Sequence, residues 1–255
     1  ADARAGRIVF VGDAAMRVRE DYLRILRFFR FFAWYGEGAP DAAALAACAA
    51  LKDGLAGLAA ERVTKELLKL LAAPDPRAAL RLMAQTGVLA AILPKADDLS
   101  VFEAMVALSP DPLLRLAALA PRDAAATATA LRLSNAQRDR LIAATAADIA
   151  PMDSRAARAA LYADGAQTFA DRARLAWAAG RGGEDDWAPL LALAEHWSQP
   201  VLPVNGADAV AAGIAPGPAM GAALRAVEAW WVDEDFAPDR AAVLERLAAI
   251  ARAAT

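Results

Sequence analysis

Residues 17–36 read RVREDYLRILRFFRFFAWYG, and this stretch decides the fold class. The pattern predicts one long helix from about Arg17 to Tyr35, which Gly36 ends. The first half of the helix carries charged residues on one side and apolar residues on the other. Beyond Phe28 the stretch is apolar nearly all round, which is typical of a helix buried within a helical core. We therefore expect an all-α fold built around this helix.

The composition of the whole chain also favours helices. Of the 255 residues, 58% are hydrophobic and 7% are aromatic, and alanine supplies much of the apolar content. Alanine loses no side-chain entropy on entering a helix. No stretch offers about twenty apolar residues free of charge, so we expect no membrane span. The N-terminus shows no signal-peptide pattern.

Charge and rare residues exclude several classes of protein. The net charge of −3 argues against a globally basic nucleic-acid binder, although local basic faces can still bind phosphates. Cys48 and His196 are the single cysteine and the single histidine, which excludes internal disulfides, multi-thiolate metal sites and histidine-based clusters or triads. We expect a cytoplasmic protein that binds no metal through this chain.

The segment Arg7–Val11 (RIVFV) predicts one short N-terminal β-strand, followed by Gly12 and Asp13 as a turn or helix cap. An isolated strand leaves its backbone groups unpaired. We therefore expect its partner sheet to lie upstream in a domain absent from this chain, and the start at Ala1, without methionine, agrees with that expectation.

Glycine- and proline-rich breaks divide the chain into three helical parts, which we expect to form an elongated multi-helix array. The parts cover residues 1–95, 96–198 and 199–255. In the first part, after the long helix, further helices are expected around 41–51, 60–72 and 76–91. Ser134 and Gln137 have the spacing of a capping box, and the acidic run 184–186 is expected in a linker. A last helix is expected from about Pro238.

The start of the long helix gathers charged side chains on one face. At about 100° per residue, five of them fall within an arc of roughly 120°: Arg17, Glu20, Asp21, Arg24 and Arg27. An exposed helix face, with a Glu20–Arg24 ion pair contributing about 0.2–0.5 kcal/mol, explains the same spacing without any ligand. Spacing alone leaves both interpretations open.

The residues of this face resemble a known family. The run Gly12-Asp13-x-x-x-Arg17-x-x-Glu20-Asp21-x-x-Arg24-x-x-Arg27 is similar to the adjoining C and D motifs of class II CCA-adding tRNA nucleotidyltransferases and their poly(A) polymerase relatives. Later segments resemble the family's E motif and tail, namely Glu61-Arg62-Val63 with Glu66-Leu67, and then NGAD (205–208), PGP (216–218) and Trp230-Trp231. The resemblance is strongest over about 7–94. It implies that the three parts are a neck, a body and a tail without the catalytic head.

In that family, the Asp and Arg of the D motif read the base of the incoming nucleotide. The resemblance therefore implies that Asp21 and Arg24 are the readers and that Glu20 supports Arg24. Cytosine and adenine each present an amino donor beside a ring-nitrogen acceptor, which match a carboxylate that accepts and a guanidinium that donates. Guanine and uracil present the reverse pair, and their binding would leave buried groups unpaired at about 1–3 kcal/mol each.

The remaining motif residues have less direct roles. Asp13 and Arg17 match the C motif, which is thought to couple head and neck, although a helix cap plus a solvated arginine is an equal alternative. Arg27 is either a phosphate contact or a structural ion pair. The E-motif residues are expected to brace the neck helices rather than touch substrate: Glu61, Arg62 and Glu66.

The resemblance implies an enzyme that adds CMP and AMP from CTP and ATP to tRNA 3′ ends. We expect no catalytic residue in this chain, because the Mg²⁺-binding carboxylates of the family lie in the head. This chain alone is therefore expected to be inactive, and its partners are the head, nucleoside triphosphates, and the acceptor arm and elbow of tRNA. A poly(A) polymerase, an A-adding enzyme, or a non-catalytic helical RNA-binding or scaffold protein remain alternatives.

Overall fold

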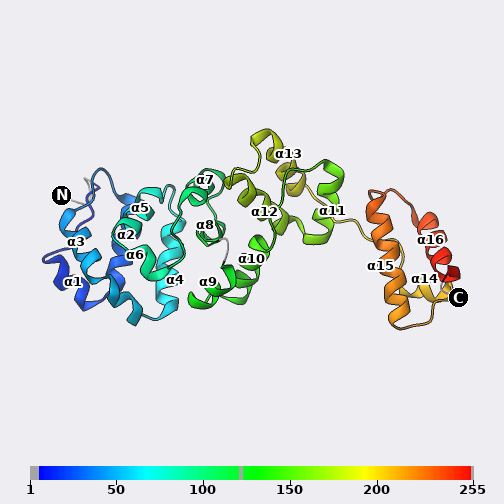
Figure 1. Cartoon of the computed structure of the whole chain (residues 1–255), viewed down its shortest axis with the longest axis horizontal. Helices are drawn as coiled ribbons and strands as arrows, with labels where there is room; N and C mark the ends of the chain where they lie inside the picture. Colours follow the sequence, from blue (N-terminus) through cyan, green and yellow to red (C-terminus); the bar gives the residue numbers. More distant parts are fainter. Residues whose placement is uncertain (1–5, 121–122, 254–255) are drawn as a thin grey trace. The chain divides into compact units, whose positions relative to one another are not determined.

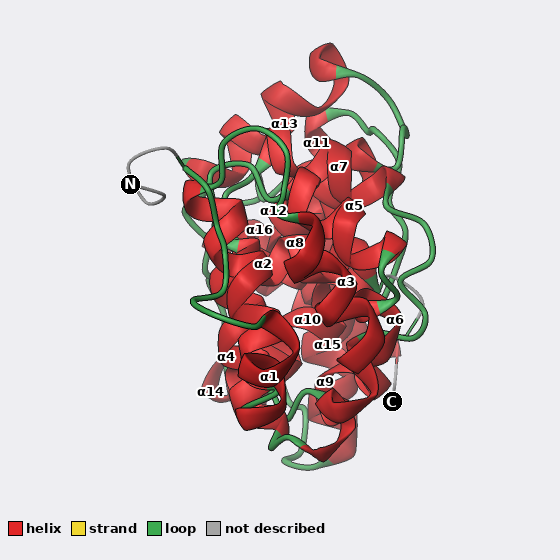
Figure 2. Cartoon of the chain, turned by 90° about the vertical axis from the view of Figure 1, so that its left-hand side faces the viewer, coloured by secondary structure: helices red, strands yellow, loops and turns green. Residues whose placement is uncertain are grey.

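The structure is a computed structural model that describes residues 6–120 and 123–253. Figures 1 and 2 show helices joined by loops, and these two stretches contain no strand. The prediction of an all-α fold is therefore confirmed. The predicted strand at Arg7–Val11 is wrong. Residues 7–10 form an irregular segment with no neighbouring strand among the described residues, and its Ile8 and Phe10 pack against the core instead. No described helix is long and apolar enough to cross a membrane.

The chain divides into two compact units, which we describe separately. The first comprises residues 1–151 and 170–187, and the second comprises 152–169 and 188–255. The division into neck, body and tail stays a prediction. The helices of the first unit are α1 (Ala14–Glu20), α2 (Leu23–Tyr35), α3 (Ala42–Leu51), the 3₁₀ helix η2 (Lys52–Gly57), α4 (Ala60–Leu71), α5 (Arg77–Gln85), α6 (Val88–Ile92), α7 (Ser100–Leu108), α8 (Pro112–Leu119), α9 (Ala124–Ala130) and α10 (Asn135–Thr145). Helices α12 (Ala166–Ala178) and α13 (Glu184–Glu195) contribute residues to both units, and the second unit holds α11 (Ser154–Asp164), α14 (Gly206–Ala211), α15 (Pro218–Asp233) and α16 (Arg240–Ala253).

The predicted single helix over 17–35 is wrong, because the chain leaves helical geometry at Asp21. That residue has φ −157° and ψ 105°, and its Oδ1 accepts a hydrogen bond from the N–H of Leu23 at 3.1 Å. Aspartate commonly caps its own backbone two residues on, which competes with continuing a helix. The following residue, Tyr22, is fixed from outside, since a Cβ added to Gly54 would lie 2.1 Å from its ring. The result is a rigid corner between α1 and α2.

Several other boundaries follow local capping rules. The predicted capping box is present, with the Ser134 hydroxyl accepting from the N–H of Gln137. The predicted helix 76–91 is two helices, because Gly87 adopts the left-handed φ of 74° between them. The acidic run 184–186, predicted as a linker, forms the first turn of α13. Negative side chains are favourable at a helix N-terminus, so these charges help to start the helix.

The core of the first unit is centred on α2 and α4, which run in the same direction. Ile25, Phe29 and Leu67 have at most 1% of their surface exposed, and burying each such side chain contributes about 1.5–3 kcal/mol. Cys48 of α3 lies in the same core, and burial raises the pKa of its thiol to about 12. This packing holds the start of α2 beside the start of α4.

Arg115 of α8 is a buried cation that binds backbone carbonyls. Only 2% of the residue is exposed. Its Nη1 donates to Leu71 O at 2.6 Å and to Ala73 O at 2.7 Å, and its Nε donates to Ser109 O at 2.7 Å. These oxygens lie at the C-terminal ends of α4 and α7, where helix carbonyls lack intrahelical partners. Arg115 therefore joins two helix ends to α8.

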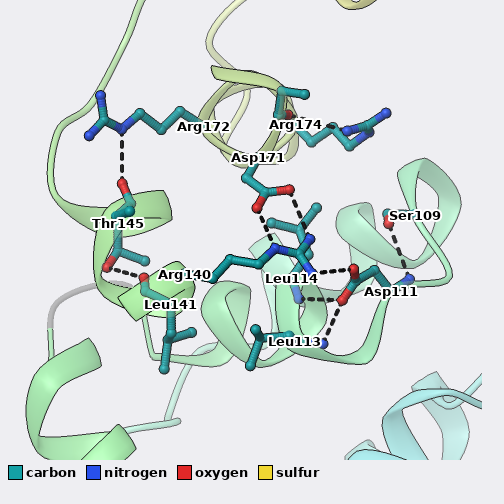
Figure 3. A network of polar contacts seen from close by, with 12 residues as sticks. Ser109, Asp111, Leu113, Leu114, Arg140, Leu141, Thr145, Asp171, Arg172 and Arg174 are labelled. Atoms are coloured by element: carbon teal, nitrogen blue, oxygen red, sulfur yellow. Dashed lines mark hydrogen bonds and ion pairs between the residues drawn. The ribbon is translucent and has the colours of Figure 1, made fainter. Parts of the chain in front are cut away.

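A second arginine joins three helices of the same unit. Figure 3 shows Arg140 of α10 between two carboxylates, Asp171 of α12 and Asp111, which caps α8. Its guanidinium lies 2.7 Å from an oxygen of each carboxylate. Burial by itself would raise the pKa of Asp111, but the bonds from Arg140 and from the Leu114 and Leu113 N–H groups outweigh it, so this pKa is lowered.

The second unit is built around a cluster of rings. Tyr162 of α11 packs edge-on against Trp231 of α15 at 6.2 Å, and Phe236 lies 5.1 Å from Trp231. The Tyr162 hydroxyl donates to Glu228 at 2.6 Å. Burial, together with this carboxylate, raises the pKa of Tyr162 to about 12. A capping box at Asn205 and Asp208 begins α14.

Candidate functional site

The α1–α2 corner presents a small network of charged side chains around Glu20. The Nη1 atoms of Arg17 and Arg24 each lie 2.6 Å from Glu20 Oε2, and Arg24 Nη1 also donates to Arg17 O at 2.6 Å. These arginines, Arg24 first, lower the pKa of Glu20 below its ordinary value of 4.5. Glu20 therefore remains a carboxylate at neutral pH and fixes the position of Arg24.

Asp21 lies next to this network but has a different partner. Its Oδ2 accepts from Nη2 of Arg62, at the start of α4, at 3.1 Å. The backbone N–H of Arg24 donates to Asp21 O at 3.0 Å, but the two side chains have different partners and are not paired with each other. Their side chains are 28% and 27% exposed, so solvent reaches both. The Arg24 side chain donates to the described residues through Nη1 alone, which leaves its other guanidinium N–H groups available to a ligand.

Further along α2, a buried carboxylate of α4 holds two arginines. Glu66 is 5% exposed, and its Oε1 lies 3.6 Å from Nε of Arg27. Nη1 of Arg30 lies 2.7 Å from Oε2 without the alignment of a hydrogen bond. Arg30 is not among the predicted site residues. A single charged residue within FFRFF nevertheless indicates that this residue needs a partner of opposite charge. These contacts tie α2 to α4.

The other predicted residues lie apart from this face. Asp13 caps α1, with its Oδ1 accepting from Met16 N at 2.7 Å. Glu61 binds Arg132, in the turn between α9 and α10, at 2.9 Å. A backbone hydrogen bond and then Arg132 lower the pKa of Glu61. The structure thus brings Arg17, Glu20, Asp21 and Arg24 together with Arg62, and leaves Asp13 and Glu61 at separate contacts.

The end of α2 differs from its prediction. The sequence indicated burial all round beyond Phe28, yet three rings are exposed: Phe31 at 41%, Trp34 at 42% and Tyr35 at 63%. At about 100° per residue, the buried residues of α2 and these three rings are centred on opposite sides of the helix, so the side with the rings faces solvent. No group of three or more histidine, cysteine or acidic residues suited to a metal ion occurs among the residues that the structure describes.

Comparison with known proteins shows that this chain is similar to CCA tRNA nucleotidyltransferases. A family model described as the probable RNA and SrmB-binding site of polymerase A matches residues 39–99, which include α3 to α6. The mitochondrial CCA tRNA nucleotidyltransferase 1 of Mus musculus is 30% identical over 245 residues, covering 91% of this chain and 56% of that protein. Its Homo sapiens counterpart is 29% identical, covering 90% of this chain and 56% of that protein.

A solved structure agrees with these sequence matches. The Bacillus stearothermophilus CCA-adding enzyme, crystallised in complex with CTP, superposes with a TM-score of 0.75 at 26% identity. The match covers 98% of this chain and 67% of that one. The chain thus spans somewhat more than half the length of the curated relatives from mouse and human.

Proposed function

From the premise that this chain belongs to the family of CCA tRNA nucleotidyltransferases and their poly(A) polymerase relatives, we propose that it selects the nucleotides that such an enzyme adds to tRNA 3′ ends. The observation that carries this proposal is the α1–α2 corner, where Glu20 holds Arg24 beside the carboxylate of Asp21. The products would be CMP and AMP additions from CTP and ATP.

The corner has the donors and acceptors that base selection needs. Arg24 keeps N–H groups that can serve a ring nitrogen, while Asp21, whose oxygens accept one bond each, retains lone pairs for an amino group. Cytosine and adenine satisfy both side chains. Guanine and uracil would place a carbonyl against the carboxylate and an N–H against the guanidinium, at a cost of about 1–3 kcal/mol for each unpaired group. No template strand is needed for this choice.

The chemistry itself requires other groups. We assign the Mg²⁺-binding carboxylates and the triphosphate site to a nucleotidyltransferase head, supplied in the same polypeptide or separately, and expect these 255 residues to be inactive alone. The names of the relatives support tRNA as the acceptor. Contact with the acceptor arm and elbow of tRNA is part of the same proposal, as is a cytoplasmic location.

A poly(A) polymerase is the second candidate, because the family model matching residues 39–99 is named for polymerase A. The two enzymes differ in product. A CCA-adding enzyme extends tRNA lacking its 3′ end by two cytidines and one adenosine, whereas a poly(A) polymerase adds adenosines without a defined end. Sequencing of the product made with CTP and ATP together therefore distinguishes them.

The test combines the chain with a nucleotidyltransferase head and truncated tRNA. We expect incorporation of CMP and AMP, and we expect Asp21→Ala and Arg24→Ala to reduce incorporation and to weaken the preference for CTP and ATP over UTP and GTP. Arg81→Ala is the control, since Arg81 forms an exposed ion pair with Glu103 on other helices of the same unit. Unchanged selectivity in both corner variants would sink the base-reading assignment. No incorporation by any head-containing form would favour the scaffold alternative.

A further inference from the structure

We propose that the exposed end of α2 is a stacking platform for unpaired RNA nucleotides. The platform consists of Phe31, Trp34 and Tyr35 of α2, flanked by Lys69 of α4. The proposal rests on the proposed function only in taking RNA as a partner of the protein, and it assigns a contact surface away from the base-reading corner.

The exposed aromatic residues of this protein are concentrated in one place. Among the phenylalanine, tyrosine and tryptophan residues that the structure describes, the exposed ones are Phe31, Trp34 and Tyr35, and all three lie within five residues of sequence. The centroids of the Phe31 and Tyr35 rings are 6.3 Å apart, and those of Trp34 and Tyr35 are 6.4 Å apart. Exposed apolar side chains that are grouped on a protein surface, rather than scattered, often mark an interaction site.

Contacts with neighbouring residues hold the rings of the platform in place. The Trp34 indole N–H donates to Lys69 O at 2.8 Å, which fixes this ring against α4. The Arg30 guanidinium carbon lies 4.4 Å from the centre of the Phe31 ring, and Arg30 is itself held by the buried Glu66. The side chains of Arg30, Lys69 and the three rings, together with Ala72, line one shallow hollow.

Positive charge accompanies the rings. On α4, Arg62, Lys65 and Lys69 are exposed and fall within an arc of roughly 60° at 100° per residue. Two of the four lysines of the chain lie in this stripe. On α2, Arg27 is 48% exposed and lies on the same side as Phe31 and Trp34, within roughly 60° of arc. The acidic groups nearby are Glu66, which is buried, Asp21, which pairs with Arg62, and Glu37, which is exposed beyond the end of α2.

This combination fits single-stranded RNA better than an apolar protein partner. Unpaired bases stack on aromatic side chains, while lysines and arginines neutralise the phosphates between them. The family model for an RNA-binding site covers Lys65, Lys69 and Ala72. Since α2 and α4 run in the same direction, the platform lies along the same pair of helices as the base-reading corner.

The test measures RNA binding by the full 255-residue chain. The probes are a fluorescein-labelled 12-nucleotide RNA of adenosines and cytidines, and the same strand annealed to its complement. Phe31→Leu/Tyr35→Leu keeps apolar surface but removes two rings, whereas Tyr35→Phe keeps the ring. We expect the double variant to bind the single strand roughly tenfold more weakly or worse, with the duplex affinity changed less than twofold and Tyr35→Phe equal to the wild type. Unchanged thermal melting of the variants confirms that they fold.

Lys69→Gln provides an independent measurement. Each phosphate contact with a single strand contributes about 0.7 to the slope of log affinity against log salt. We expect this variant to lose about that much of the slope, while Arg81→Gln, at an exposed ion pair on other helices, keeps the wild-type slope.

Two results would overturn the platform. One is wild-type affinity of the double leucine variant for the single strand, which would assign the rings to a protein partner. The other is an equal loss for single strand and duplex. Neither result concerns nucleotide selectivity, which Asp21 and Arg24 variants test. The platform can therefore fail while base reading stands, and base reading can fail while the platform stands.

Discussion

Arg62, at the start of α4, donates a hydrogen bond at 3.1 Å to the carboxylate of Asp21, which lies 41 residues earlier in the chain. The sequence predicts different roles for them in different motifs: Arg62 as a residue that braces the neck helices, and Asp21 as a reader of the nucleotide base. In the structure they form one contact. The orientation of the Asp21 carboxylate is therefore set partly by α4.

Arg62→Gln is expected to loosen nucleotide selectivity while barely changing stability. The Arg62 side chain is 50% exposed, and pairs of this kind typically contribute about 0–1 kcal/mol to folding. In a head-containing protein, the ratio of CTP and ATP to UTP and GTP incorporation should fall, because Asp21 loses one of its two restraints. A thermal melt measures stability in parallel. Arg81→Gln should change neither quantity, and a large loss of stability without a change in selectivity would contradict this account.

The Glu20–Arg24 contact should respond to acid in a defined direction. The two arginines lower the pKa of Glu20 below 4.5, so the contribution of this carboxylate is fully present above that value and is lost as pH falls through the lowered pKa. NMR titration of the Glu20 side chain should show this lowered midpoint. In Arg24→Ala the midpoint should move back toward the ordinary value. An identical midpoint in the variant would show that Arg24 is not the main cause.

Arg115→Met should destabilise the first unit strongly. The substitution keeps apolar volume but leaves the carbonyls of Leu71, Ala73 and Ser109 without their buried donor. Each unsatisfied buried group costs about 1–3 kcal/mol, so we expect a loss on the order of 3 kcal/mol or more. Urea unfolding followed by circular dichroism measures it. Arg81→Met, which removes an exposed arginine from the same unit, should leave the urea midpoint close to that of the wild type.

Cys48 should report unfolding of the first unit. The thiol is buried, and its pKa of about 12 means that almost none is thiolate at neutral pH. We expect a thiol-reactive dye to label the native chain very slowly and to label it fully in urea. Leu67→Ala, which weakens the same core, should accelerate native-state labelling. Rapid labelling of the unmodified native chain would show that α3 is less tightly packed than the structure indicates.

Short-range signals in the sequence predicted the fold well. Asp13 and Ser134 cap α1 and α10 because a cap depends on side chains within three residues. The predicted helices at 41–51 and 60–72 match α3 and α4 to within a residue at each end. The sequence indicated Gly54, by contrast, only as part of an Asp-Gly break between helices. Its close approach to the Tyr22 ring, 32 residues earlier in the sequence, is a long-range contact that gave no signal.

The predictions of one helix over 17–35 and of burial at its end were wrong for two different physical reasons. At Asp21 the helical period continues in the sequence, but a local aspartate cap replaces the helix there, and periodicity carries no information about such competition. At Phe31 and Trp34, apolar residues all round suggested burial, yet both rings lie on the solvent side of α2. The contacts of Glu66 with Arg27 and Arg30, and of Asp21 with Arg62, are long-range and depend on how α2 lies against α4.

The contact between Gly54 and Tyr22 makes the geometry of the proposed base-reading corner sensitive to a substitution outside it. A single added methyl group at position 54 would lie 2.1 Å from the Tyr22 ring, so the ring would have to move. We expect the corner between α1 and α2 to move with it. Substitutions confined to the charged residues among 17–27 would change the charged side chains of the corner but leave Gly54, and its contact with Tyr22, in place. A substitution at position 54 is instead expected to shift the Asp21 carboxylate relative to the Arg24 guanidinium without changing either residue. Under the proposed function, this glycine would therefore influence substrate choice from outside the site.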